Sequence, residues 1–344
     1  MKKRLLLIAC CYIISNHVAS SQTFNDPVAY LEFVANEQNN ITKTMWQYTK
    51  AIAHSKSDRT IENKRNTVIK SLQRAIAKIE KAESFNNDYF KEKVLDNLKL
   101  NESLMKNEYE KIIDMKEVAE QSYDAMEAYV LAREMADKKM TEAQQIYEAN
   151  YIAYAARHQI KLLESETDLG KKMEISSKVF DYYNKMYLAF FKVYINEIYL
   201  FDAIERNDIS AMQQNANALS EAAKEGKDSL SNIELYKNDT SILQATHKAF
   251  DFFIEEANDK MPILIDFLVK NSDFETLQQT LENTPERKRS KEQIDDYNNK
   301  VKDINKAVKV YNETNEILNK KRQEVMNDLS IANQKFLGKH IPND

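Results

Sequence analysis

Glycine and proline are so scarce in this chain that few folds are open to it. The 344 residues include 3 Gly and 4 Pro, whereas an average composition supplies about 40 of the two together. Folds rich in strands need many tight turns, and tight turns depend on these residues. The glycines, Gly170, Gly226 and Gly338, are also too far apart to form a phosphate-binding loop. The sequence therefore excludes Rossmann, P-loop and barrel folds and predicts a nearly all-helical protein, with 43% hydrophobic residues to form its core.

The first 21 residues are typical of an export signal. A basic start precedes an apolar segment over residues 5–15 and a small-residue cleavage site, which predicts cleavage between Ser21 and Gln22. Removing these residues takes away three basic side chains and no acid, so the formal charge falls from −5 to −8. An acidic exported protein is a poor candidate for binding nucleic acid. We expect it in the periplasm or at the surface of a Gram-negative bacterium.

Both cysteines, Cys10 and Cys11, lie inside this signal. The mature chain is thus expected to have no disulfide, no Cys-ligated metal and no cysteine nucleophile. Cys10 also has the small-residue-then-Cys pattern of a lipoprotein cleavage site, but only four apolar residues precede it, which favours secretion over a lipid anchor. No later segment is long and apolar enough for a transmembrane helix, since the most apolar run, residues 186–191, has lysines on both sides.

Capping residues mark where helices begin and end. In the first half, Asp26-Pro27 and Ser57-Asp58 predict the starts of two helices, and the turn at residues 85–88 predicts a third. A capping-box pattern at Asp114 and Glu117 predicts a break before a fourth helix. In the second half, Pro262 predicts a kink or break near residues 260–261.

The two halves share landmarks. The matching pairs are Asp58 with Asp208, residues 85–88 with 236–239, and residues 112–114 with 264–266, at offsets of 150, 151 and 152 residues. This regularity fits a duplicated four-helix unit, and it equally fits any bundle with helices of similar length. We therefore predict an elongated all-α bundle of long antiparallel helices, and the sequence leaves open whether it forms two tandem four-helix units. The predicted segments are a signal peptide (1–21), an N-terminal unit (22–163), a C-terminal unit (164–338) and a tail (339–344).

Residues 294–336 give the strongest helical signal. Apolar residues or Tyr recur at alternating steps of three and four, interrupted only by Asn315 and Arg322. A seam with this spacing predicts coiled-coil-like packing against long neighbouring helices over about 65 Å.

The mature sequence shows no group of catalytic or metal-binding residues. None of its four histidines follows a Glu by three residues, and no His-Glu-x-x-His motif occurs. His54 and His340 lie near predicted helix ends, where a cation is favourable. Asp124 and Glu127 could share a helix face, but with 54 acids in the chain a solvated pair is the simpler interpretation. We predict a non-enzymatic protein with no cofactor and no metal.

One predicted helix is crowded with aromatic residues. Nine Phe and Tyr side chains fall between residues 180 and 201, around most of the helix circumference. This predicts a central, buried helix, and core packing is the favoured interpretation. The alternative is the wall of a cavity for an apolar ligand. The residues of this predicted wall are Tyr183, Tyr187, Phe190, Phe191 and Tyr194.

Three segments carry a resemblance to known proteins. They are Asp26-Pro27-Val28-Ala29-Tyr30-Leu31-Glu32-Phe33, Lys50-Ala51-Ile52-Ala53-His54-Ser55, and Asp114 with Tyr123-Asp124-Ala125-Met126-Glu127-Ala128-Tyr129. Over residues 26–160 the chain resembles a family of exported surface proteins of Gram-negative bacteria whose function is unknown, and more loosely helical lipoproteins. The resemblance implies an envelope or surface location and transfers no functional residue.

Two functions stay open from the sequence. The first is a non-enzymatic envelope or surface protein whose helices form an interaction scaffold for a protein or another envelope component. The alternative is a periplasmic carrier that holds an apolar ligand beside the aromatic helix, residues 180–201.

Overall fold

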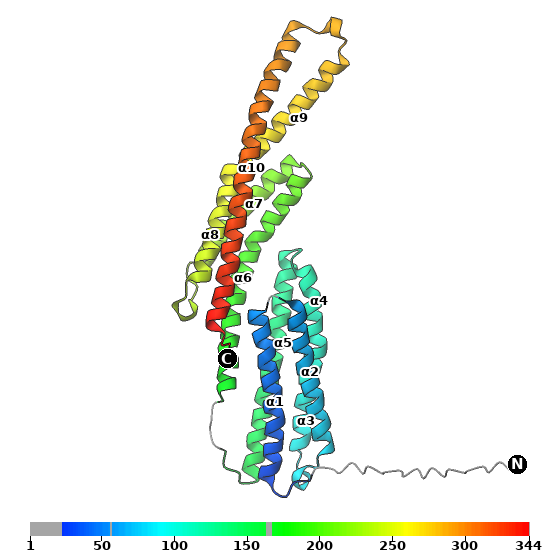
Figure 1. Ribbon diagram of the computed structural model, residues 1–344, viewed down its shortest axis with the longest axis vertical. Helices are drawn as coiled ribbons and strands as arrows, with labels where there is room; N and C mark the ends of the chain where they lie inside the picture. Colours follow the sequence, from blue (N-terminus) through cyan, green and yellow to red (C-terminus); the bar gives the residue numbers. More distant parts are fainter. Residues whose placement is uncertain (1–22, 56, 163–166, 344) are drawn as a thin grey trace, which may run out of the picture.

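The computed structural model describes residues 23–55, 57–162 and 167–343, and 88% of these residues are helical, with no strand among them. The predicted all-α fold class is confirmed. The helices form two bundles placed end to end along an elongated molecule (Figure 1). The predicted signal, its cleavage site at Ser21 and Gln22, and Cys10 lie outside the described residues.

The first unit is a four-helix bundle whose third helix is interrupted. Its helices are α1 (Pro27–His54), α2 (Asp58–Lys81), α3 (Phe90–Ser103), α4 (Tyr109–Ala119) and α5 (Tyr123–Arg157). A π-helix, Leu104–Glu108, joins α3 directly to α4. A 3₁₀ turn, Phe85–Asn87, links α2 to α3.

The second unit has the same order of elements. Its helices are α6 (Asp168–Glu205), α7 (Ile209–Leu230), α8 (Ser241–Glu255), α9 (Met261–Asn283) and α10 (Lys291–His340). A π-helix, Glu256–Lys260, joins α8 to α9, and a 3₁₀ turn, Tyr236–Asn238, links α7 to α8. Pro262 is the second residue of α9, so the predicted interruption near residues 260–261 is present as this π-helix.

Buried positions repeat between the two units, which supports the predicted duplication. They match at offsets of 152 residues for α1 and α6, 151 for α2 and α7, and 182 for α5 and α10. Buried pairs at these offsets include Tyr30 and Tyr182, Ile41 and Val193, Val68 and Leu219, Ile79 and Leu230, Ala143 and Val325, and Tyr154 and Phe336. The growth of the last offset to 182 reflects a longer α9–α10 hairpin in the second unit.

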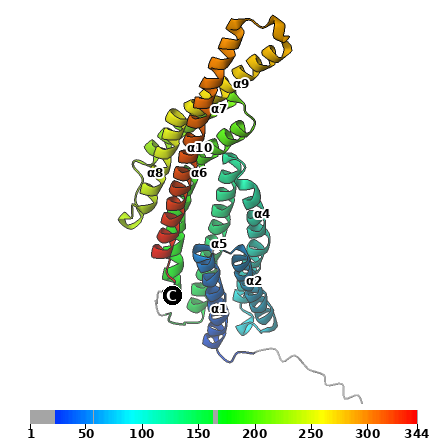
Figure 2. The ribbon, with the colours of Figure 1, turned by 45° about the horizontal axis from the view of Figure 1, so that its top comes forward.

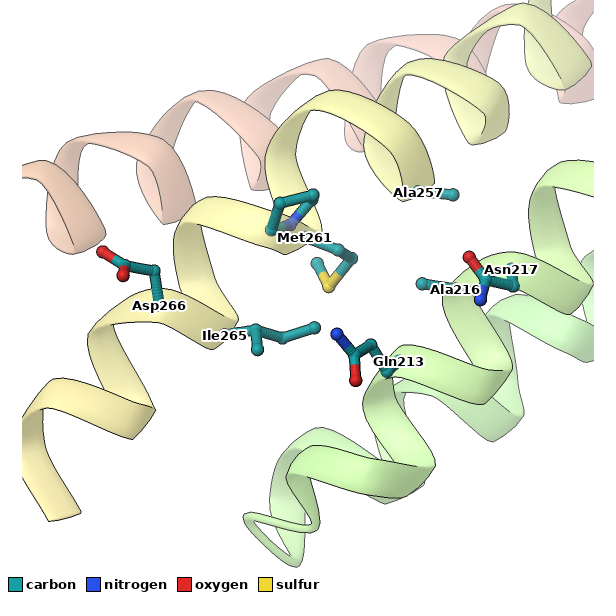
Figure 3. A pocket seen from close by; sticks show the side chains of 8 residues that line it. Gln213, Ala216, Asn217, Ala257, Met261, Ile265 and Asp266 are labelled. Carbon is teal, nitrogen blue, oxygen red and sulfur yellow. The ribbon is translucent and has the colours of Figure 1, made fainter. Parts of the chain in front are cut away.

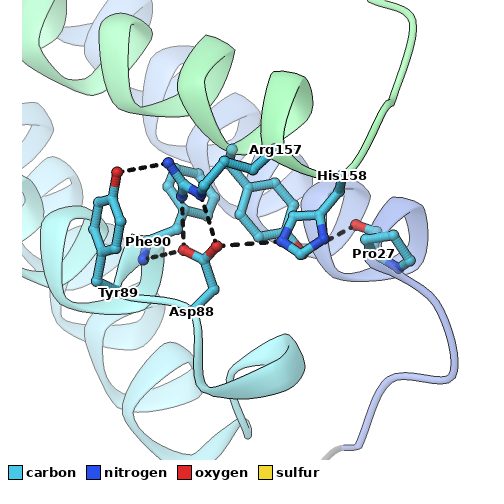
Figure 4. Close-up of polar contacts among 7 residues, drawn as sticks. Pro27, Asp88, Tyr89, Phe90, Arg157 and His158 are labelled. Carbon is cyan, nitrogen blue, oxygen red and sulfur yellow. Dashed lines mark hydrogen bonds and ion pairs between the residues drawn. The ribbon is translucent and has the colours of Figure 1, made fainter.

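An aspartate closes each unit by joining the start of its third helix to the end of its last. In the first unit, Asp88 accepts hydrogen bonds from the Phe90 backbone N–H (2.8 Å), from Arg157 Nη2 (2.7 Å) and from His158 Nε2 (3.2 Å) (Figure 4). These hydrogen bonds outweigh burial, which alone would raise the pKa of Asp88, and hold that pKa below its usual value.

In the second unit, Asp239 makes the same contacts with Ser241 N (2.9 Å), Lys339 Nζ (2.8 Å) and His340 Nε2 (2.8 Å). Its pKa is likewise lowered, by hydrogen bonds that outweigh its burial. α10 ends at His340, and both His340 and Ile341 are buried. The predicted boundary at residue 338 is therefore too early, because the packed unit extends into the predicted tail.

The predicted helix break at Asp114 is wrong. α4 continues to Ala119, and α5 begins after Ser122, whose hydroxyl caps the Ala125 N–H at 3.1 Å. Ala119 is only 1% exposed, so ending the helix at Asp114 would give up a buried contact. Other caps agree with the sequence, since the side chains of Asp26, Ser57 and Asp208 each cap their helix.

The aromatic helix α6 packs against both units, which explains aromatic residues around most of its circumference. Phe190 belongs to the core of the second unit with Phe250 and Phe253. Phe191 packs instead against Met126 and Val130 of α5, in a smaller cluster between the units. The predicted central position of this helix is confirmed.

Candidate functional site at the interrupted helix of the second unit

The π-helix of the first unit is filled by an arginine from α2. Arg65 is 6% exposed, and its Nη1 donates to the Met105 carbonyl oxygen at 2.7 Å. Its Nε and Nη2 donate to the two carboxylate oxygens of Glu62, both at 2.9 Å. The guanidinium thereby fills the space between α2 and the π-helix and satisfies a carbonyl there.

The second unit lacks this arginine. Ser57 and Asp208 are the N-caps of α2 and α7, so Ala216 occupies the position that matches Arg65, and Gln213 matches Glu62. The π-helices differ by 152 residues, which places Ala257 at the position of Met105.

The smaller side chains leave a cavity of about 330 Å³ between α7 and α9. Figure 3 shows the side chains of Met261, Ile265 and Gln213 directed toward it, with Asp266 at its edge. Its lining residues are Gln213, Ala216, Asn217, Ala257, Met261, Pro262, Ile265 and Asp266.

Beside the π-helix, two buried glutamates and one partly exposed arginine from three elements meet. Arg322 of α10 donates from Nε to Glu197 Oε1 of α6 at 2.7 Å and from Nη2 to Glu256, the first residue of the π-helix. Both carboxylates are fully buried, and each has one oxygen without a hydrogen-bond partner among the described residues. The Phe201 ring lies 4.4 Å from the guanidinium carbon, a cation–π contact. We call Glu197, Glu256 and Arg322 the ion triad.

Two buried carboxyls share one guanidinium at this site, and their burial raises the pKa of both. Burial is the larger cause for Glu256, followed by the charge of Glu197, and together they raise its pKa to about 8 despite Arg322. Burial also raises the pKa of Glu197. Burial thus favours the protonated form of both carboxyls, while the charge of Arg322 opposes it.

The first unit has apolar residues at the positions of the ion triad, namely Met45, Leu104 and Met140 at the same offsets. The sequence revealed only Arg322, as an interruption of the apolar seam of α10. Glu197 and Glu256 could not be singled out among 54 acids, because their burial follows from how α6 and α8 pack. Matching the two halves position by position was the signal that could have found them.

Above the triad and the cavity, α9 and α10 leave the bundle as a two-helix hairpin (Figures 1 and 2). We call residues 267–303 the arm. All of them are described, and none is buried: the last buried residue of α9 is Ile265 and the first of α10 is Ile304. Phe274 and Tyr297 hold the two helices together, with ring centroids 5.6 Å apart. Val269 and Ile294 remain 40% and 43% exposed.

Only part of the predicted seam on α10 is buried. Leu318, Val325, Leu329 and Phe336 are buried in the second core, while Ile294 and Val308 are exposed at the arm and its base. The seam loses its partners where the bundle ends.

The residues predicted as an apolar-ligand wall pack largely against one another's rings along α6. Four of these rings follow one another along α6, namely Tyr183, Tyr187, Phe191 and Tyr194. The centroids of successive rings in this series are 6.1 or 6.2 Å apart. The void that touches Tyr187 and Phe190 measures about 10 Å³, which is near the space of one water molecule.

No three His, Cys, Asp or Glu side chains of the described residues are placed to hold a metal ion. No helix among the described residues is long and apolar enough to cross a membrane. Comparison with protein families, curated proteins and solved structures finds no match to this chain.

Proposed function

We propose that this protein is a non-enzymatic binding scaffold of the bacterial envelope or surface, whose arm and arm base engage a partner protein. The observation that carries the proposal is the arm itself. The matching hairpin of the first unit turns after Ala119 with three residues, whereas the second unit extends it by about 30 residues without burying any of them.

A hairpin without buried residues adds little to folding stability. Each ordered residue costs about 1–2 kcal/mol of backbone conformational entropy, and two helices can bury only one stripe of each other. The arm exposes Val269 and Ile294 and presents basic residues at its tip, including Arg287 and Lys288. Exposed apolar side chains among charged ones suit contact with a protein partner.

The test shortens the arm to the length found in the first unit. Residues 272–304 are replaced by Glu-Gln-Ser, the connection that the first unit uses between α4 and α5. Because this removes one buried side chain, Ile304, the variant should fold with a small loss of thermal stability. Both chains are then used for affinity capture from Gram-negative envelope extract, with mass spectrometry of proteins and lipids.

A protein recovered by the full chain and lost with the arm would support the proposal. Equal recovery of every protein by both chains would contradict it. Recovery of stoichiometric lipid by both would instead support the alternative, a periplasmic carrier, for which the 10 Å³ void beside α6 offers little room.

A further inference from the structure

The cavity at the arm base is lined by Ala216, the residue that matches Arg65 of the first unit. In the first unit, Arg65 occupies the matching space and is held by a π-helix carbonyl and by Glu62. In the second unit the same backbone arrangement persists, but residue 216 is alanine and supplies no donor.

We propose that this cavity binds the guanidinium group of an arginine side chain supplied by a protein partner. By the 152-residue offset, the lining residue Ala257 matches Met105, whose carbonyl accepts from Arg65, so the Ala257 carbonyl is the expected acceptor. Gln213 offers an amide oxygen where Glu62 offers a carboxylate. Met261 and Ile265 provide apolar surface for the methylene stem.

Charge and size both favour arginine over other ligands. None of the eight lining residues is basic, so the lining offers no cation for an anion, and the carboxylate of Asp266 at the edge is paired with Lys270 Nζ at 2.6 Å. A volume of about 330 Å³ is at the lower end of the range for small-molecule sites, and it suits one side chain better than a lipid. The guanidinium is planar and carries five donors, so it can reach the carbonyl and Gln213 together, which an ammonium group cannot do in the same geometry.

The inference rests on the proposed binding function, since it names the group that a partner would contribute, but it is tested without any partner. The probe is N-acetyl-L-argininamide, and the matched control ligand is N-acetyl-L-lysinamide. Binding is followed by the ¹³C-methyl resonance of Met261, which lines the cavity and is assigned with the Met261→Leu variant. We expect a saturable shift with the arginine probe and at least a fivefold weaker response with the lysine control.

Two variants test the geometry. Gln213 is exposed, so Gln213→Glu should fold normally, and it restores the carboxylate of the first unit; we expect it to tighten binding by about tenfold. Ala216→Arg should fill the cavity with the chain's own guanidinium and abolish the response. If Ala216→Arg does not fold, the Gln213→Glu result still decides.

Three results would overturn the inference: no saturable shift, an equal shift with the lysine control, or unchanged affinity in Gln213→Glu. The arm-shortened chain keeps every lining residue and should bind the probe as the full chain does. A failure of partner capture is thereby distinguishable from a failure of arginine binding.

Discussion

Gly226 allows α7 to approach α6 and α8 closely, and replacing it with alanine sets two effects against each other. A Cβ at this position would lie 2.8 Å from Phe250 Cε2 and 2.9 Å from Val193 Cγ2, whereas carbon atoms in contact sit about 3.5–4.0 Å apart. Phe250 and Val193 are 0% and 1% exposed, so neither can move into solvent. Overpacking of this kind costs about 1–3 kcal/mol.

The opposing effect is helix propensity, since alanine in a helix interior is favoured over glycine by about 1 kcal/mol. We therefore expect Gly226→Ala to lower the free energy of unfolding by about 1 kcal/mol. The first unit has Ala75 and Leu98 at the positions of Gly226 and Phe250, which suggests the compensating change. In a Phe250→Leu background the contact with Phe250 is relieved and only the contact with Val193 remains, so the effect of Gly226→Ala should become about neutral.

The assay is urea unfolding followed by circular dichroism at 222 nm for wild type, both single variants and the double variant. The double-mutant cycle should give a coupling energy of about 1 kcal/mol. Gly338→Ala is the control, because a Cβ there meets nothing within 4 Å and should stabilise by up to about 1 kcal/mol. If Gly226→Ala costs as much in the Phe250→Leu background as in wild type, the packing argument is refuted.

Four further predictions concern Glu256, Asp239, Phe191 and the N-terminus of the processed chain. Because the folded-state pKa of Glu256 is raised to about 8, above its unfolded value, this group lowers stability by up to about 1.4 kcal/mol per pH unit as pH rises from 5 to 8. Glu256→Gln should remove that slope in urea titrations, and a constant difference between variant and wild type across this range would contradict it. Asp239→Asn should cost about 2 kcal/mol at pH 7. The pKa of Asp239 is lowered in the folded state, so its contribution to stability is present above its unfolded-state pKa and is lost as the pH falls through its folded-state pKa. The stability difference between Asp239→Asn and wild type should therefore shrink in acid. A pH-independent stability difference would argue against the assigned contacts. Phe191→Ala should cost about 3–5 kcal/mol, with no apolar probe able to restore the melting temperature, whereas saturable probe binding by wild type would favour the carrier. Mass spectrometry of the exported chain should find Gln22 at its N-terminus, and an acylated Cys10 would instead show a lipoprotein.

The sequence alone determined the fold class and most helix starts, because those depend on local chemistry. Scarce glycine and proline exclude strand-rich folds, and the Asp26, Ser57 and Asp208 side chains cap their own helices three residues away. The predicted duplication rested on landmarks at offsets of 150 to 152 residues, whereas the buried positions of α5 and α10 match at an offset of 182. The break at Asp114 was predicted wrongly because a local capping pattern competed with the burial of Ala119, which depends on a distant helix.

Only the tertiary structure decided which polar residues matter. Glu197, Glu256 and Arg322 are far apart in the sequence and resemble any exposed ions until three helices bring them together in a dry core. The cavity also could not be predicted from the sequence. It lies where α7 has Ala216 at the position of Arg65 in α2, and that difference matters only because Arg65 contacts the π-helix in the folded first unit. Helix propensity and capping act over a few residues, so they can be predicted from the sequence. The desolvation of the ion triad and the volume of the cavity depend on how distant helices pack.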